Sequence, residues 1–203
     1  TFKNLLTGFK YIGELITELE KQGKASDFVM GFEESYGYLA GTHARDKDAV
    51  VASMLICEMA AYYKSQGKTL IDVMNGLYDE FGYYCNTVQS YTFEGAAGME
   101  KMAAIMDGLR DNKPSSFAGY EVTKIDDYKT SKSTIVKTGE ESEITLPKSN
   151  VLAYTLTNGN KVIVRPSGTE PKIKAYITAI GQSEENAKEI AQKLLDDANE
   201  LMK

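Results

Sequence analysis

The residues with the clearest chemistry lie near the C-terminus, in the segment 165–171, Arg-Pro-Ser-Gly-Thr-Glu-Pro. Arg165 carries a permanent charge and a planar fork of donors that fits two phosphate oxygens. Ser167 and Thr169 add hydroxyl donors, and Gly168 has no Cβ, so the backbone can approach an anion closely. We call this segment the anion loop, and its residue types predict a phosphate site. The alternative is a surface turn with an incidental arginine.

Strand-like sequences flank the anion loop. Apolar and other residues alternate over 151–156, and Asn158-Gly159 is a two-residue turn signal before the apolar run 161–164. Alternation resumes over 172–177. The anion loop is therefore predicted to join two strands at the edge of a sheet.

A second polar segment, 31–37, has the sequence Gly-Phe-Glu-Glu-Ser-Tyr-Gly and follows the apolar run 28–30, a predicted buried strand. Glu33 or Glu34 can accept hydrogen bonds from two adjacent sugar hydroxyls, and Ser35 both donates and accepts. We call this segment the carboxylate loop. The alternative is that its carboxylates are solvated surface charges.

An amphipathic helix is predicted near the N-terminus, because apolar residues recur at helical spacing from Leu5 to Leu19. Thr7, Gly8 and Lys10 stand in and before its first turn. Gly8 can mark a loop that presents Lys10 to a site.

The sole histidine, His43, is followed by Arg45 and Lys47 and then by an apolar run over 49–63. That run predicts a helix that is apolar on nearly all sides and therefore buried, with Asp46 or Asp48 near its N-terminus. His43 is expected to pack or to lie in a loop, because the sequence offers no serine or cysteine nucleophile for it to serve. Lys47 suits a phosphate ligand, and the alternative for both cations is a surface ion pair.

The chain of 203 residues has room for two domains. A boundary is predicted at 82–86, which gives a first domain over 1–85 and a second over 86–203. The second domain runs strand, helix, strands, helix, with a polar insertion over 129–150. This order predicts an α+β fold, with helices against one face of a largely antiparallel sheet.

Composition narrows the class of protein. The net charge of -6 argues against non-specific nucleic-acid binding. Cys57 and Cys85 have no metal or disulfide spacing and are expected to be reduced, in the cytoplasm. No apolar run is long enough to cross a membrane, and no signal peptide opens the sequence. The first residue is Thr1 rather than methionine, so we expect a piece of a longer protein.

The carboxylate loop, the pattern His43-x-Arg45-x-Lys47-Asp48 and the anion loop occur in this order over nearly the whole chain. In this they resemble the C-terminal half of the α-D-phosphohexomutases, most closely the bacterial phosphoglucomutase/phosphomannomutase type. The resemblance implies that 1–85 is the latter part of the family's third domain, of mixed α/β fold. It implies that 86–203 is the fourth domain, an α+β fold like that of the TATA-binding protein.

Positions matching the family motifs would bind the substrate. By this resemblance Glu33 and Ser35 contact sugar hydroxyls, and Gly8 and Lys10 belong to a specificity loop in which Phe9 stands at an often aromatic position. The phosphate would be bound by Arg165, Ser167, Gly168 and Thr169, with Lys47. His43 matches an active-site position less securely.

The resemblance also implies chemistry that these residues lack. The family transfers a phosphoryl group between a phosphoserine and a hexose 1- or 6-phosphate, through a bisphosphate that reorients. The phosphoserine loop and the aspartate-rich Mg²⁺ loop are absent from this sequence, so no catalytic or metal-binding residue is assigned here. We expect N-terminal domains of the same polypeptide to supply both, glucose 1,6-bisphosphate to act as activator, and this chain alone to be inactive.

Other functions remain open. One is a stand-alone sugar-phosphate-binding module, and another is a scaffold whose polar loops are incidental. Within the family, phosphopentose and phosphoglucosamine mutases are alternatives. An aminosugar substrate is less favoured, because Tyr36 follows the carboxylates where related aminosugar mutases tend to have a small residue.

Overall fold

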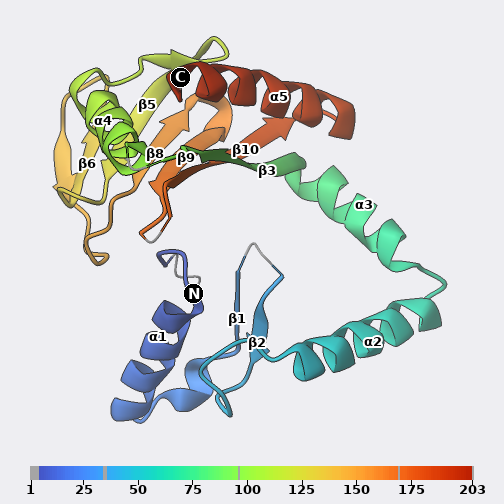
Figure 1. The fold of residues 1–203 in the computed structure, drawn as a ribbon. Coiled ribbons are helices and arrows are strands. Elements are labelled where there is room, and N and C mark those ends of the chain that lie inside the picture. The colour runs from blue at the N-terminus through green and yellow to red at the C-terminus, as the bar shows by residue number, and fades with distance from the viewer. Residues whose placement is uncertain (1–4, 34–35, 96, 169, 203) are drawn as a thin grey trace. The chain divides into compact units, whose positions relative to one another are not determined.

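A computed structural model describes residues 5–33, 36–95, 97–168 and 170–202. The chain forms two compact units, Thr1–Gly76 and Leu77–Lys203, shown in Figure 1. The division falls inside helix α3 (Leu70–Phe81). The first strand of the second unit begins at Tyr83, directly after Gly82.

The first unit is built on a small core beside a two-stranded hairpin. Its elements are α1 (Phe9–Lys21), a 3₁₀ turn (Ala25–Asp27), β1 (Met30–Phe32), β2 (Tyr38–Ala40) and α2 (Ala49–Ser65), followed by α3. The two strands are antiparallel, with Phe32 opposite Tyr38. The buried residues that form the core are Phe9, Ile12, Ile16, Phe28 and Leu39. The amphipathic pattern thus identified the helix, although the helix begins at Phe9 rather than at Leu5.

The prediction that the helix after Lys47 is buried was wrong. Helix α2 has no buried residue, and Val50 and Met54 are 80% and 62% exposed. Helix α3 also has none, and Ile71 is 72% exposed. A sequence that is apolar on all sides shows that a helix requires partners, but it does not show where those partners lie. The described residues leave most of the α2 surface open.

The second unit is a twisted antiparallel sheet. Its strands are β3 (Tyr83–Thr92), β4 (Ser116–Phe117), β5 (Tyr120–Asp127), β6 (Lys132–Ile135), β7 (Glu141–Glu143), β8 (Leu152–Leu156), β9 (Lys161–Pro166) and β10 (Lys172–Gly181). Their order is β3-β10-β9-β8-β5-β6-β7, and β4 pairs with β5. The segment 129–150, expected to be a polar insertion, therefore supplies the edge hairpin β6–β7. A 3₁₀ turn at Thr157–Gly159 connects β8 to β9, instead of the two-residue turn expected there.

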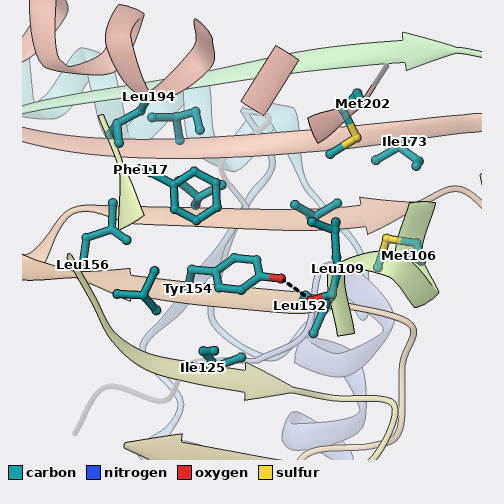
Figure 2. Close-up of a cluster of buried hydrophobic side chains, with 14 of the residues drawn as sticks. Met106, Leu109, Phe117, Ile125, Leu152, Tyr154, Leu156, Ile173, Leu194 and Met202 are labelled. Atoms are coloured by element: carbon teal, nitrogen blue, oxygen red, sulfur yellow. Dashed lines mark hydrogen bonds between the residues drawn. The ribbon is translucent and has the colours of Figure 1, made fainter. Parts of the chain in front are cut away.

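Helices α4 (Gly98–Asp111) and α5 (Glu184–Leu201) cover one face of this sheet (Figure 1), as the sequence predicts. They pack on a continuous core that includes Met106, Tyr154 and Leu194 (Figure 2). In α4, Met102, Met106 and Leu109 are buried, whereas Met99 is 46% exposed. Ser183 caps α5, because its Oγ accepts a hydrogen bond from the Asn186 N–H at 3.1 Å.

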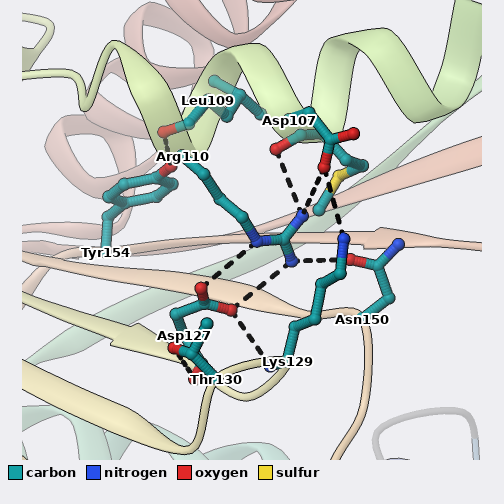
Figure 3. A network of polar contacts seen from close by, with 9 residues as sticks. Asp107, Leu109, Arg110, Asp127, Lys129, Thr130, Asn150 and Tyr154 are labelled. Atoms are coloured by element: carbon teal, nitrogen blue, oxygen red, sulfur yellow. Dashed lines mark hydrogen bonds and ion pairs between the residues drawn. The ribbon is translucent and has the colours of Figure 1, made fainter.

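A polar network fastens α4 to the sheet (Figure 3). Arg110 donates to Asp127 on β5 at 3.2 Å and to the Asn150 side chain at 2.6 Å. Its guanidinium is 13% exposed and the Asp127 carboxylate 16%. Beside it the Tyr154 hydroxyl donates to the Leu109 carbonyl, and burial raises the pKa of this phenol. The network holds α4 over the sheet, on the face opposite Arg165.

Candidate substrate-binding site

The anion loop is a tight connection between β9 and β10. The Ser167 N–H donates to the Lys172 carbonyl at 2.7 Å, and the Glu170 N–H donates to the Ser167 hydroxyl at 3.2 Å. Gly168 is exposed, and the space where a Cβ would stand is open. Thr169 lies outside the described residues. The prediction of two flanking strands is confirmed, but these strands are not at the edge of the sheet, because β3 pairs with the far side of β10.

Arg165 lies on the sheet face that α4 and α5 leave uncovered. In the strand register it stands opposite Lys174 of β10, which is exposed. In the part of the chain that the structure describes, neither cation has a hydrogen-bond or ion-pair partner. The nearby carboxylate of Glu170 binds Lys172 instead, at 3.3 Å. The loop therefore offers a half-buried guanidinium that no other described residue neutralises.

Sequence reasoning did not connect Lys174 with the anion loop. The alternation over 172–177 places Lys172 and Lys174 on one face, but only the register shows that Arg165 is on that same face. Ser90 of β3 stands opposite Lys174 on its other side and is also exposed. Three residues with donor side chains, Arg165 of β9, Lys174 of β10 and Ser90 of β3, therefore form a row across the sheet.

The carboxylate loop closes the β1–β2 hairpin. The Glu33 N–H donates to the Gly37 carbonyl at 2.8 Å, which fixes the backbone at both ends of the loop. Glu33 is half-buried, and Tyr36 is 91% exposed with a positive φ of 65°. Ser35, the other predicted sugar ligand, lies outside the described residues.

Lys47 reaches the carboxylate loop from the segment before α2. Its Nζ is 2.8 Å from Asp46 Oδ1 and lies over the Phe9 ring, 5.3 Å from the centroid. The hydrogen bond with Asp46 raises the pKa of Lys47, and the charge of Glu33 adds to this increase. The first unit therefore brings together Lys47, Glu33 and the start of α1.

The other two predicted residues near α1 have different surroundings. Gly8 is the N-cap of α1, with φ of 132°, a conformation that favours glycine. Lys10 lies with its Nζ over the neighbouring Tyr11 ring, 4.9 Å from the centroid, and its side chain is exposed. Gly8 thus sets the direction in which the chain enters the helix.

His43 is held at the N-terminus of α2. Its Nε2 lies 2.8 Å from Asp48 Oδ2, and Asp48 Oδ1 accepts hydrogen bonds from the Val50 and Val51 N–H groups. The hydrogen bond with His43, followed by that from Val51, lowers the pKa of Asp48. Asp48 is therefore the N-cap, as one of the two aspartates was predicted to be. Arg45 pairs with Glu20 of α1 at 2.5 Å.

The described residues contain neither a metal-binding cluster nor a membrane-spanning helix. Among residues 5–33, 36–95, 97–168 and 170–202, no group of three His, Cys, Asp or Glu side chains is placed to hold a metal ion. None of the described helices is long and apolar enough to span a bilayer. Cys57 and Cys85 are free thiols.

The sequence matches two consecutive models of one family. These are the phosphoglucomutase/phosphomannomutase α/β/α domain III, over residues 1–81, and the C-terminal domain of the same family, over residues 100–197. Curated relatives include a phosphoglucomutase of Staphylococcus epidermidis, 40% identical over 96% of this chain and 34% of the relative. Another, from Staphylococcus aureus, is 41% identical over 87% of this chain and 31% of the relative.

A solved structure has a similar fold. It is the open form of the exocytosis-sensitive phosphoprotein pp63/parafusin from Paramecium, with a TM-score of 0.63 and 18% identity, covering 97% of this chain and 32% of that one. This chain thus spans about a third of the length of the relatives that it matches. It belongs to the phosphoglucomutase/phosphomannomutase family, and it corresponds to the family's third-domain and C-terminal-domain models.

Proposed function

We propose that this chain is the substrate-recognition part of a hexose-phosphate mutase that interconverts the 1- and 6-phosphates of glucose and mannose. The observation that carries the proposal is the guanidinium of Arg165, which has no ion-pair partner in the described part of the chain and lies beside a tight loop that carries the Ser167 hydroxyl. Partial burial of a cation without an ion-pair partner costs desolvation free energy, and a bound phosphate would offset this cost. Curated phosphoglucomutases among the relatives support the reaction class.

The two loops would have different roles. In the anion loop, Arg165, Ser167, Gly168 and Thr169 would bind the phosphate that is not transferred. In the carboxylate loop, Glu33 and Ser35 would accept and donate hydrogen bonds to ring hydroxyls, and Gly8 and Lys10 would line the same sugar subsite. Lys47 would add a second cation for phosphate, with His43 as a further active-site group.

Such a division of labour suits a substrate that must reorient. A phosphate site and a carboxylate that accepts two adjacent hydroxyls do not depend on which end of the sugar carries the phosphate. One set of contacts can therefore hold either pose of a hexose bisphosphate. Positioning and charge stabilisation supply most of the rate in phosphoryl transfer, so these contacts would count directly toward catalysis.

The transfer itself would need groups outside this sequence. The described residues do not fit a Mg²⁺ site, because no carboxylate cluster is placed to hold the ion. Magnesium and the phosphoserine would come from N-terminal domains of the same polypeptide, in the cytoplasm, with glucose 1,6-bisphosphate as activator. We expect the isolated chain to bind substrate without turning it over.

Titration of the ¹⁵N-labelled chain with glucose 1-phosphate tests the proposal. The expected result is a saturable shift of amide signals at residues 165–168 and at Glu33, with weaker binding by the Arg165→Ala variant. Galactitol, which lacks phosphate, is the control and should leave residues 165–168 unchanged. A scaffold function would be favoured instead if millimolar glucose 1-phosphate moved neither group of signals.

A further inference from the structure

Lys47 lies against two residues that have no charge, Phe9 and Gly37, which together we call the slot. The first is Phe9, whose ring centroid is 5.3 Å from the ammonium. Phe9 is only 4% exposed, because it also packs in the core of the first unit with Ile12 and Leu39. A core side chain of this kind is held in one rotamer by its neighbours. The ring is therefore a fixed surface for the lysine.

The second residue of the slot is Gly37, at the end of the carboxylate loop. A Cβ at position 37 would lie 2.4 Å from Lys47 Cδ, 2.8 Å from Lys47 Cγ and 3.1 Å from Glu33 Oε2. The φ of Gly37 is outside the left-handed region, so its backbone does not require glycine. Position 37 requires glycine because the methylene groups of Lys47 fill the space that a Cβ would occupy.

The carboxylate beside Lys47 constrains it less than this slot does. The Asp46 side chain is 74% exposed and that of Lys47 is 47% exposed, and ion pairs between such exposed groups are weak and easily rearranged. The slot walls, in contrast, are a buried ring and a backbone segment fixed by the hydrogen bond between Glu33 and Gly37. The position of the ammonium is therefore set mainly by the slot.

We infer that Phe9 and Gly37 are positioning residues, which hold the Lys47 ammonium next to Glu33 so that a phosphate-binding cation and a hydroxyl-binding carboxylate are presented together. This inference rests on the proposed function, since it concerns the same substrate site. It assigns Phe9 a role through Lys47, in addition to its place in the core. It also predicts that substitution of either Phe9 or Gly37 alone disturbs the position of Lys47.

The test compares two variants with two matched controls in the full 203-residue chain. Phe9→Leu removes the ring, and Phe28→Leu removes another phenylalanine of the same core, 8% exposed, over which no ammonium group lies in the described part of the chain. Gly37→Ala fills the slot, and Gly76→Ala adds a methyl group in α3 where nothing lies within 4 Å. Two quantities are measured, the dissociation constant for glucose 1-phosphate and the ¹H shift of the Lys47 ε-methylene.

In the unaltered chain the ring of Phe9 should shift the Lys47 ε-methylene signal upfield, and both Phe9→Leu and Gly37→Ala should return it toward the random-coil value. Both should weaken glucose 1-phosphate binding about tenfold, the scale of one charge-assisted hydrogen bond. Phe28→Leu and Gly76→Ala should stay within about twofold of the unaltered chain and keep the shifted signal.

Three outcomes would overturn the inference, and they are distinguishable. If the unaltered chain binds glucose 1-phosphate and the two slot variants bind it as well as their controls do, the slot has no positioning role and the proposed function stands. If the unaltered chain does not bind glucose 1-phosphate, the proposed function fails and the inference fails with it. A control that loses binding as severely as its partner variant would also refute the slot, because general loosening of the unit would then explain both.

Discussion

Two arginines of the second unit have opposite surroundings, and these surroundings predict opposite effects of mutation. The Arg165 side chain has no hydrogen-bond or ion-pair partner among the described residues, so Arg165→Ala breaks no polar contact there. In a complete enzyme we expect the variant to lose about 2 kcal/mol or more of affinity for glucose 1-phosphate, the scale of a charge-assisted hydrogen bond to phosphate. Calorimetric titration measures the loss, and the melting temperature in the absence of phosphate should not fall.

Arg110→Ala is the matched control. The side chains of Arg110 and Asp127 are largely buried, 13% and 16% exposed, and removal of Arg110 would leave the carboxylate without this cation. Breaking a buried pair in this way typically costs about 3–5 kcal/mol of folding free energy. Arg110→Ala should therefore melt earlier and, while folded, bind glucose 1-phosphate normally. If Arg165→Ala were the variant that unfolded, Arg165 would be structural.

Glu33 allows a prediction about specificity. Glu33→Gln retains shape but replaces one acceptor oxygen by a donor, so it should weaken the contact with two adjacent hydroxyls. Glucose and mannose differ only at C2, and a contact remote from C2 should serve both. We expect kcat/KM for the two 1-phosphates to fall by the same factor, measured in a complete enzyme. A loss confined to one of the epimers would contradict the shared contact.

At the scale of elements, the pairing of β9 with β10 places two cations directly opposite each other. Like charges at such positions destabilise a sheet by roughly 0.2–1 kcal/mol. Lys174→Met should therefore raise the melting temperature slightly in the absence of phosphate, yet weaken phosphate binding. Differential scanning fluorimetry with and without phosphate reports both effects.

Lys161→Met is the control for this pair. Lys161 is also exposed on β9, but it stands opposite Thr178 rather than a cation. Its replacement should change neither the melting temperature in buffer nor the stabilisation by phosphate. Equal behaviour of the two variants would mean that the opposition of Lys174 and Arg165 has no consequence.

Local signals at the level of elements were predictable from the sequence. Ser183 caps α5, and Thr69 and Asp72 exchange hydrogen bonds at the start of α3. Each of these motifs is complete within four residues, so the local sequence is enough to identify it. The anion loop between two strands was predictable for the same reason. Lys174 facing Arg165, and Phe28 serving as a core residue outside a strand, depend on register and packing between distant segments. No local pattern contains that information.

At the scale of the whole chain, the two units have separate cores. The first core contains Ile16, which is fully buried, and the second contains Leu194, also fully buried. The described residues of the two cores share no side chain. Because cooperative unfolding follows shared packing, we expect each unit to open on its own, and the unit with the smaller core to open first.

A pair of cavity variants tests this independence. Ile16→Ala and Leu194→Ala should each cost about 2–5 kcal/mol, but in different units. Native-state hydrogen exchange should show faster exchange only at α1 and β2 amides for Ile16→Ala, and only at α5 and β10 amides for Leu194→Ala. Uniform acceleration throughout the chain by either variant would show one cooperative unit. Independent opening would also mean that a defect in the first unit weakens substrate binding by Lys47 and Glu33, while the anion loop keeps its affinity for phosphate.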